Sequence, residues 1–168
     1  MKILVDADSC PRDVRALILR SSRRTKIPVV FAANHPIPGI NGQNVIMEVC
    51  PGGEGSVDNR IVELAIPGDL AVTRDIPLAE RLVEAKICVL DDRGRVYSKE
   101  NIRYCRSLRD FSIGLAENGM GSERTALYGK KELKAFADSF DRELVKLKKI
   151  PAKTSLNPLP PGTDSESV

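Results

Sequence analysis

The sequence predicts an α/β fold, a three-layer sandwich in which a mostly parallel central sheet of about five strands is flanked by helices. Three observations lead to this prediction. Apolar runs of strand length alternate along the chain with amphipathic segments of helix length. Several of these runs are hydrophobic at every position, which is typical of strands covered on both faces. Aromatic residues make up 4% of the 168 residues and Trp is absent, so the core has to be aliphatic.

The first part of the chain contains the predicted sheet. Strands are expected over residues 2–6, 28–34, 44–50, 67–73 and 87–91. Helices are expected between them, over residues 10–24, 56–66 and 76–86. Pro11 and Pro77 stand near the first turns of two of these helices, and Ser56 is a suitable N-cap for the other. The segments "NHPIPGINGQ" and "PGGEG" are rich in Pro and Gly and are expected to be loops.

The last part of the chain is predicted to be helical and then disordered. Two helices are expected at about residues 99–117 and 130–149, which makes residues 1–149 one domain. The connection between them is polar and contains glycine. Residues 150–168 are rich in Pro, Ser and acids and offer little to bury, so a disordered tail is expected there.

Composition sets limits on location and partners. The formal net charge is +3, and Lys and Arg gather at residues 20–26, at 104–110 and in the last helix. Such runs are typical of solvated helix faces, although they also permit a nucleic-acid partner. Four scattered cysteines and one histidine do not form a zinc-binding pattern. The opening apolar run is too short for a signal peptide or a membrane span, so we expect a cytoplasmic protein that does not associate with membranes.

Aspartates stand where strands of the predicted sheet end. Asp6 and Asp8 follow the first strand, Asp75 follows the fourth, and Asp58 lies in the first turn of the helix after "PGGEG". Ligands of an open parallel sheet bind at the carboxyl ends of its strands, so we expect these four carboxylates to share a site. If the first strand stays extended past Val5, alternation points Asp6 and Asp8 to the same side.

Such a site needs protons or cations. Two like charges about 5 Å apart repel by roughly 3 kcal/mol at an effective dielectric constant near 20. A helix cap contributes only about 1 kcal/mol per acid. Ligands that are all oxygen favour Mg²⁺ or Mn²⁺ over zinc, and such ions activate water and hold phosphate oxygens. Taken singly, Asp58 and Asp75 could instead stabilise helix N-termini. Asp91 and Asp92 precede an Arg-Gly turn and are left out of the core site.

Several segments, in this order, resemble the YaiI/YqxD family of small bacterial proteins, which is grouped with the PIN-like nuclease superfamily. They are "VDADSCP", "VDNRIVELA", "GDLAVTRDIPLAERLVE", "RGRVYSKENI" and "LRDF", and the resemblance covers most of residues 1–149. It implies a PIN-like fold and a Mg²⁺ or Mn²⁺ site formed by Asp6, Asp58 and Asp75, with Asp8 as a further acid. It also allows a homodimer.

The sequence departs from the family pattern in two places. The family often lacks acids where Asp91 and Asp92 stand. It commonly carries a Gly-Pro element and an Asp-Arg pair before the last helix, where this chain has "GSERTALYGKKELKAF".

Three functions are compatible with these residues. The first is a metal-dependent nuclease acting on RNA, with substrate contacts sought among Asn34, Asn59, Thr73, Arg74 and Arg109. The second is a haloacid-dehalogenase-like phosphatase with Asp6 as the nucleophile. That mechanism needs a hydroxyl at the end of the second strand, where this chain has "AANH". The third is a domain that binds nucleic acid without turnover.

Overall fold

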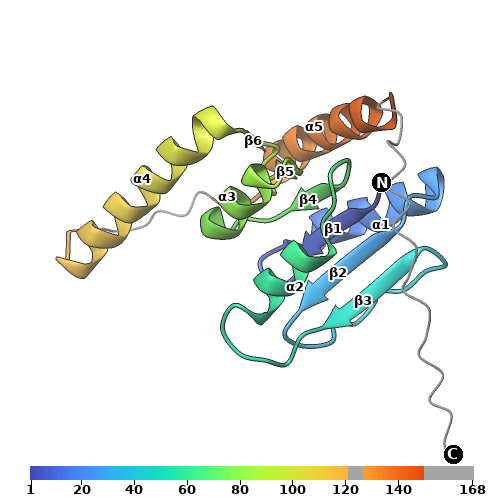
Figure 1. Cartoon of the computed structure of the whole chain (residues 1–168), viewed down its shortest axis with the longest axis horizontal. Helices are drawn as coiled ribbons and strands as arrows, with labels where there is room; N and C mark the ends of the chain where they lie inside the picture. Colours follow the sequence, from blue (N-terminus) through green and yellow to red (C-terminus); the bar gives the residue numbers. More distant parts are fainter. Residues whose placement is uncertain (121–126, 150–168) are drawn as a thin grey trace, which may run out of the picture.

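The computed structural model describes residues 1–120 and 127–149. The expected tail at 150–168 and part of the connection before the last helix lie outside the described residues. Strands and helices alternate along the first two thirds of the chain, and two long helices follow (Figure 1). The elements are β1 (Ile3–Asp6), α1 (Arg12–Thr25), β2 (Val29–Ala33), β3 (Val45–Val49), α2 (Ser56–Leu64), β4 (Leu70–Val72), α3 (Ile76–Glu84), β5 (Cys88–Leu90), β6 (Val96–Tyr97), α4 (Lys99–Glu117) and α5 (Lys130–Lys149).

The strands form one sheet with the order β3-β2-β1-β4-β5-β6. The first five are parallel, which confirms the predicted mostly parallel sheet. The sixth strand was not predicted. It pairs antiparallel with β5 after a tight turn and contains only Val96 and Tyr97. Two residues are too few to show a hydrophobic period, so only the pairing with β5 identifies this strand.

Helices cover both faces of the sheet, which gives the predicted three layers (Figure 1). Side chains of a strand alternate between the two faces. In β1, Ile3 and Val5 belong to the core cluster that includes residues of α1 and α5, whereas Leu4 belongs to the cluster that includes residues of α2, α3 and α4. Phe136 and Phe140 of α5 stack on one another with ring centroids 5.3 Å apart in the first cluster.

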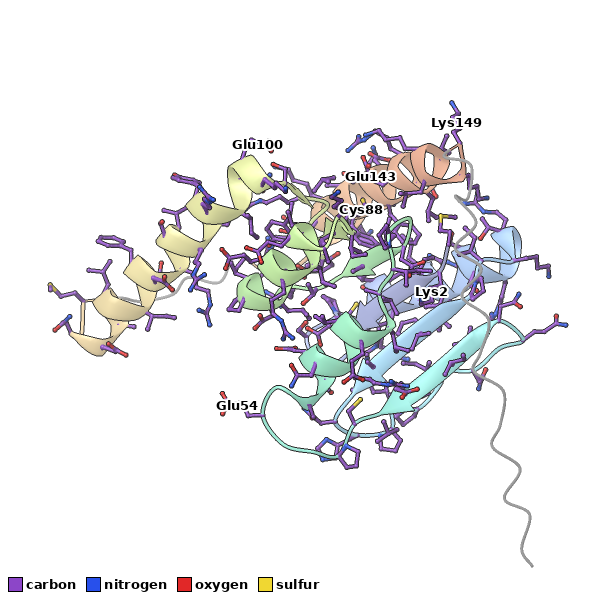
Figure 2. The ribbon with its side chains drawn as sticks, in the orientation of Figure 1. Lys2, Glu54, Cys88, Glu100, Glu143 and Lys149 are labelled. Carbon is purple, nitrogen blue, oxygen red and sulfur yellow. The ribbon has the colours of Figure 1, made fainter. Side chains whose placement is uncertain are left out.

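A buried ion pair fixes β1 beside β4. The carboxylate of Asp69, just before β4, is 1% exposed and accepts hydrogen bonds from the backbone N–H of Lys2 at 2.8 Å and from its ammonium group at 2.5 Å. Figure 2 labels Lys2 at the start of β1. The same carboxylate accepts the N–H of Ile66 at 3.0 Å. These bonds set the register of the two central strands, in which Val5 is paired with Val72.

The strand order creates a topological switch point between β1 and β4. From β1 the chain moves outward on one side to β2 and β3, and it then returns to the other side of β1 to form β4 and β5. The connections leave a crevice at the carboxyl ends of the strands where the direction of winding reverses, and ligands of open α/β sheets bind there. Asp6 is the last residue of β1, so it lies at this point.

The turn between β5 and β6 provides a test of the packing of α5. Gly94 has a φ of +85°, and a Cβ added to it would lie 2.4 Å from the carbonyl oxygen of Ala135 in α5. Gly39 has nearly the same φ, +83°, but open space around it. We expect Gly39→Ala to lower the free energy of unfolding by about 1–2 kcal/mol through backbone strain alone. Gly94→Ala should cost about 1–3 kcal/mol more, because it also overpacks the contact with α5. Equal losses in urea unfolding would contradict this packing.

Candidate functional site

The four predicted aspartates line one cavity. It has a volume of about 460 Å³ and lies at the carboxyl ends of the central strands. Its walls are formed by residues from β1 and the turn after it, from the end of β2, from the start of α2 and from the β4–α3 connection: Asp6, Asp8, Ser9, Asn34, Gly55, Val57, Asp58, Arg74 and Asp75. Carboxylates that are far apart in the sequence therefore share one solvent-accessible hollow.

Asp6 is the acid of the site whose side chain accepts the most hydrogen bonds from the described residues. Like Leu4, it points to the α2 and α3 side of the sheet, because alternate strand residues share a face. The residue is 6% exposed, and its Oδ2 accepts hydrogen bonds from the hydroxyls of Ser9 at 2.7 Å and Thr73 at 2.9 Å. Oδ1 accepts no hydrogen bond from the described residues. One oxygen of Asp6 is thus held from behind while the other remains available for a ligand.

Asp8 reaches the cavity from a turn. The condition under which Asp6 and Asp8 would alternate along one strand is not met as far as Asp8, because the strand ends at Asp6 and residues 7–9 form a turn. The N–H of Ala7 makes the last bond to β2, to the carbonyl of Ala32, and the Ser9 hydroxyl then bonds back to Asp6. A serine that bonds to a carboxylate three residues earlier favours such a turn over a continued strand. Asp8 accepts the N–H of Asn34 at 2.8 Å, which ties the turn to the end of β2.

Asp75 caps α3 and is linked to Asp6 through Thr73. Its Oδ1 accepts the N–H of Leu78 at 2.8 Å, and its own N–H donates to the Thr73 hydroxyl at 3.0 Å. The same hydroxyl donates to Asp6. Thr73 is 2% exposed and does not line the cavity, so it orients the two acids from behind. The capping role foreseen for Asp75 is present, and it occurs together with a place in the site.

Asp58 is the least constrained acid. It is half-buried in the first turn of α2 and has no hydrogen bond or ion pair within the described residues. Burial raises its pKa above the ordinary value, and the charges of Asp75 and then Asp6 raise it further, whereas Arg81 lowers it. Asp58 therefore lies near enough to Asp75 and Asp6 for their charges to act on it.

Arg74 is the one cation among the residues that line the cavity in the described parts of the chain. Its Nε lies 3.4 Å from Oδ1 of Asp92, whose side chain is 3% exposed. The other oxygen of Asp92 is buried without a hydrogen-bond partner in the described structure, and burial raises the pKa of this carboxyl. Asp92 thus supports Arg74 from outside the cavity. Asp91 accepts the N–H groups of Arg93 and Arg95 at 2.9 and 2.8 Å, which is the expected structural role in the turn.

The residues considered as substrate contacts are only partly brought together. Asn34 and Arg74 line the cavity, as described above. Asn59 is exposed outside it and accepts a hydrogen bond from Arg81 at 3.1 Å. Arg109 lies on α4 beside Asp110, 3.7 Å away, and does not line the cavity either.

The sequence analysis did not single out Ser9 or Asp92 as parts of the site. The signal for Ser9 was its position three residues after Asp6, a spacing at which a hydroxyl can bond back to the carboxylate. Cys10, next to it, is 5% exposed, and burial raises the pKa of its thiol to about 12. It is therefore a packed thiol and not a nucleophile.

The cavity contains oxygen ligands of the type that hard cations prefer, but these ligands are not grouped around one position in the described structure. No His or Cys lines the cavity in the described parts of the chain, and carboxylate oxygens without nitrogen or sulfur favour Mg²⁺ or Mn²⁺. Within residues 1–120 and 127–149, no group of three or more His, Cys, Asp or Glu side chains is positioned to hold an ion. Burial is the main cause of the raised pKa of Asp58, and the negative charges of Asp75 and Asp6 add to it, which is the part that a cation would offset. Holding an ion would therefore require these carboxylates to come closer together than they lie in the described structure.

Comparison with known proteins identifies the family. A profile described as the uncharacterised YaiI/YqxD family matches residues 4–146, a range that contains all four aspartates. The chain belongs to the YaiI/YqxD family. Relatives named UPF0178 protein include one from Treponema denticola, 42% identical over 146 residues, which cover 87% of this chain and 93% of the relative. The relative from Myxococcus xanthus is 42% identical over 153 residues, which cover 91% of this chain and 100% of the relative.

No solved structure matches this YaiI/YqxD protein. Among the described residues, no helix combines the length and the apolar character that crossing a membrane requires.

The raised pKa of Asp58 predicts a stability effect. Burial first, and then the charges of Asp75 and Asp6, raise this pKa in the folded state, so ionisation above it favours the unfolded chain. In the absence of divalent cations, Asp58→Asn should therefore raise the free energy of unfolding at pH 7 by up to about 0.5 kcal/mol, since solvent screens a carboxylate that is only half-buried. The gain should disappear as the pH falls below the ordinary Asp value of 3.8, where the carboxyl is protonated in both states. Chemical denaturation at several pH values measures this. Asp141→Asn, on an exposed ion pair of α5, is the control and should bring no gain.

Proposed function

We propose that this YaiI/YqxD protein is a nuclease that depends on Mg²⁺ or Mn²⁺ and hydrolyses phosphodiester bonds of RNA. The observation that carries the proposal is the convergence of four aspartates, from three separate segments, on one cavity at the switch point of the sheet. Structural roles account for single acids, such as the cap made by Asp75, but not for all four in one hollow. The resemblance to PIN-like nucleases supports the same assignment for Asp6, Asp58 and Asp75.

The acids that line the cavity would have different roles in the proposed reaction. Asp6, Asp58 and Asp75 would hold the ion, and Asp8 would orient a water molecule. A hard divalent ion at this place activates water and neutralises phosphate charge. The Thr73 and Ser9 hydroxyls keep Asp6 from turning away, since both bond to the same oxygen.

Arg74 is suited to binding a substrate phosphate. Its side chain is 44% exposed beside the cavity, and a guanidinium donates to phosphate oxygens in a planar, charge-assisted pair. Asp92 would keep the group in place between encounters with substrate. We propose that the protein acts in the cytoplasm, in keeping with four cysteines that are free in the structure.

The phosphatase alternative has less support. A nucleophilic Asp6 would need a hydroxyl at the end of β2 and a lysine to hold the phosphoryl group. The end of β2 contributes Asn34, and the described residues that line the cavity do not include a lysine. We therefore do not propose this activity.

The nuclease proposal predicts cleavage of single-stranded RNA that requires Mg²⁺ or Mn²⁺. We expect Asp6→Asn and Asp75→Asn each to lower the cleavage rate by at least about 100-fold, the scale on which a missing charge-stabilising group acts. Labelled oligonucleotides resolved on a denaturing gel give the rates. Asp141→Asn is the matched control, because it removes a carboxylate charge far from the cavity and should keep full activity.

The outcomes separate the alternatives. Cleavage that persists in both variants would come from a contaminant and would end the proposal. RNA binding that weakens steeply with salt, without any product at high protein and Mn²⁺ concentration, would instead indicate a non-catalytic nucleic-acid-binding domain.

The candidate site also predicts cation binding that is independent of turnover. Millimolar Mn²⁺ should raise the melting temperature of the wild-type protein, because the ion relieves the repulsion among the acids and binds the folded state alone. The increase should be lost in Asp58→Asn and retained in Asp141→Asn. An equal increase in all three proteins would show that the ion binds elsewhere.

A further inference from the structure

The long helix α4 carries an apolar stripe that nothing in the described structure covers. Tyr104, Leu108 and Phe111 are 66%, 46% and 65% exposed, and Leu115, one turn further on, is half-buried. At 100° per residue, these four side chains fall within an arc of about 60°. The buried residues of the helix, Ile102 and Cys105, belong to the core cluster with α3 and lie on a different side.

The arrangement of the described elements leaves this stripe accessible. In Figure 1, α4 starts beside β6 and extends away from the sheet, so that its second half lies well apart from the rest of the described chain. Figure 2 labels Glu100 at the attached end and shows side chains projecting around the free part of the helix. Four large apolar side chains in line on a projecting helix are unusual for a face that only meets water.

The spacing of the stripe is self-complementary. Its members are separated by four, three and four residues, and this series is the same in both chain directions. In an antiparallel pair of identical helices, Tyr104 would therefore lie over Leu115 of the second copy, and Leu108 over Phe111. A two-fold interface requires this property, because the same patch must match itself.

Small residues border the stripe on both sides. Ser107 and Gly114 lie along one side and Ser112 along the other, and no charged residue after Glu100 lies within about 60° of the centre of the stripe at 100° per residue. Small flanking residues let two helix backbones approach closely, so that the large side chains can interdigitate.

The charges of α4 select the antiparallel arrangement. The segment 99–109 holds four cations and one acid, whereas 110–117 holds two acids and no cation. Antiparallel pairing places the basic half of one helix beside the acidic half of the other, and parallel pairing would place like charges together. After Glu100, the charged residues of α4 lie at least about 110° from the centre of the stripe at 100° per residue, so these charges act at longer range than the apolar contacts.

We infer that the stripe Tyr104–Leu108–Phe111–Leu115 is the interface of a homodimer in which two copies of α4 pack antiparallel. A helix of 19 residues is about 28 Å long, and two such stripes would bury eight large side chains. This corresponds to an interface on the order of 1,000 Å², near the lower limit for specific association. The dimer should therefore form at micromolar concentrations. It does not depend on the proposed nuclease activity.

The test is the mass of the full chain in solution, measured by light scattering and sedimentation from about 5 to 200 µM, a range set by the expected affinity. The wild-type protein should approach twice the chain mass of 18.4 kDa. Phe111→Asp should weaken dimerisation by at least tenfold while keeping the far-UV circular dichroism and melting temperature of a folded chain. If that variant misfolds, the Tyr104→Ala, Leu108→Ala double variant gives the same readout. Ile113→Glu is the matched control, because Ile113 is 42% exposed on the opposite side of α4.

An introduced charge pair tests the direction of the helices. Tyr104→Arg alone should weaken the dimer, and adding Leu115→Glu in the same chain should restore it, because antiparallel packing places position 104 over position 115 of the second copy. Failure of the second change to restore the dimer would overturn the antiparallel arrangement. A wild-type protein that stays monomeric at 200 µM would overturn the interface itself, as would a dimer that persists in Phe111→Asp.

Discussion

The register between β1 and β4 is the constraint on which the candidate site depends. Asp69 binds both the backbone and the ammonium group of Lys2 and thereby sets that register at one end of the two strands. At the other end, the Thr73 hydroxyl reaches Asp6 at 2.9 Å. A shift of one residue would reverse the faces of the strand and move Asp6 away from α2 and α3. The cluster of negative charge can therefore persist because buried, hydrogen-bonded groups at both ends of these strands hold it in place.

The site combines rigid and less constrained groups in a way that suits cation binding. Two hydroxyls hold one oxygen of Asp6, whereas Asp58 has no hydrogen-bond partner in the described structure and a raised pKa. In the protein without a ligand, the charges of Asp75 and Asp6 disfavour the ionised form of Asp58. A divalent ion would remove this repulsion, and its binding would be more favourable as a result. Under the proposed function, Arg74 would bind a substrate phosphate, and Asp92 would hold Arg74 in place from outside the cavity.

The two proposed functional surfaces lie on different parts of the fold. The cavity depends on the ends of the central strands and on the first turns of α2 and α3. The stripe of α4 lies on a helix that, among the described residues, packs against the body of the domain through Ile102 and Cys105 on a different side. This separation has a practical consequence, because substitutions in the stripe can alter association without touching the acids. Activity and oligomeric state can thus be measured independently.

The sequence by itself determined the class of the fold and which acids line the cavity. Continuous apolar runs predicted five strands, and acids at strand ends and in the first turn of a helix predicted that Asp6, Asp8, Asp58 and Asp75 come together, because local hydrophobic patterns and loop positions are encoded by neighbouring residues. Only the tertiary structure revealed β6, the turn that carries Asp8 and the place of Thr73 behind the two acids. These features depend on contacts between residues far apart in the chain, such as Asp6 with Thr73 and Asp8 with Asn34. The stripe on α4 was present in the sequence as well, but a helical apolar face normally indicates core, and only the folded chain showed that residues 1–120 and 127–149 leave this face uncovered.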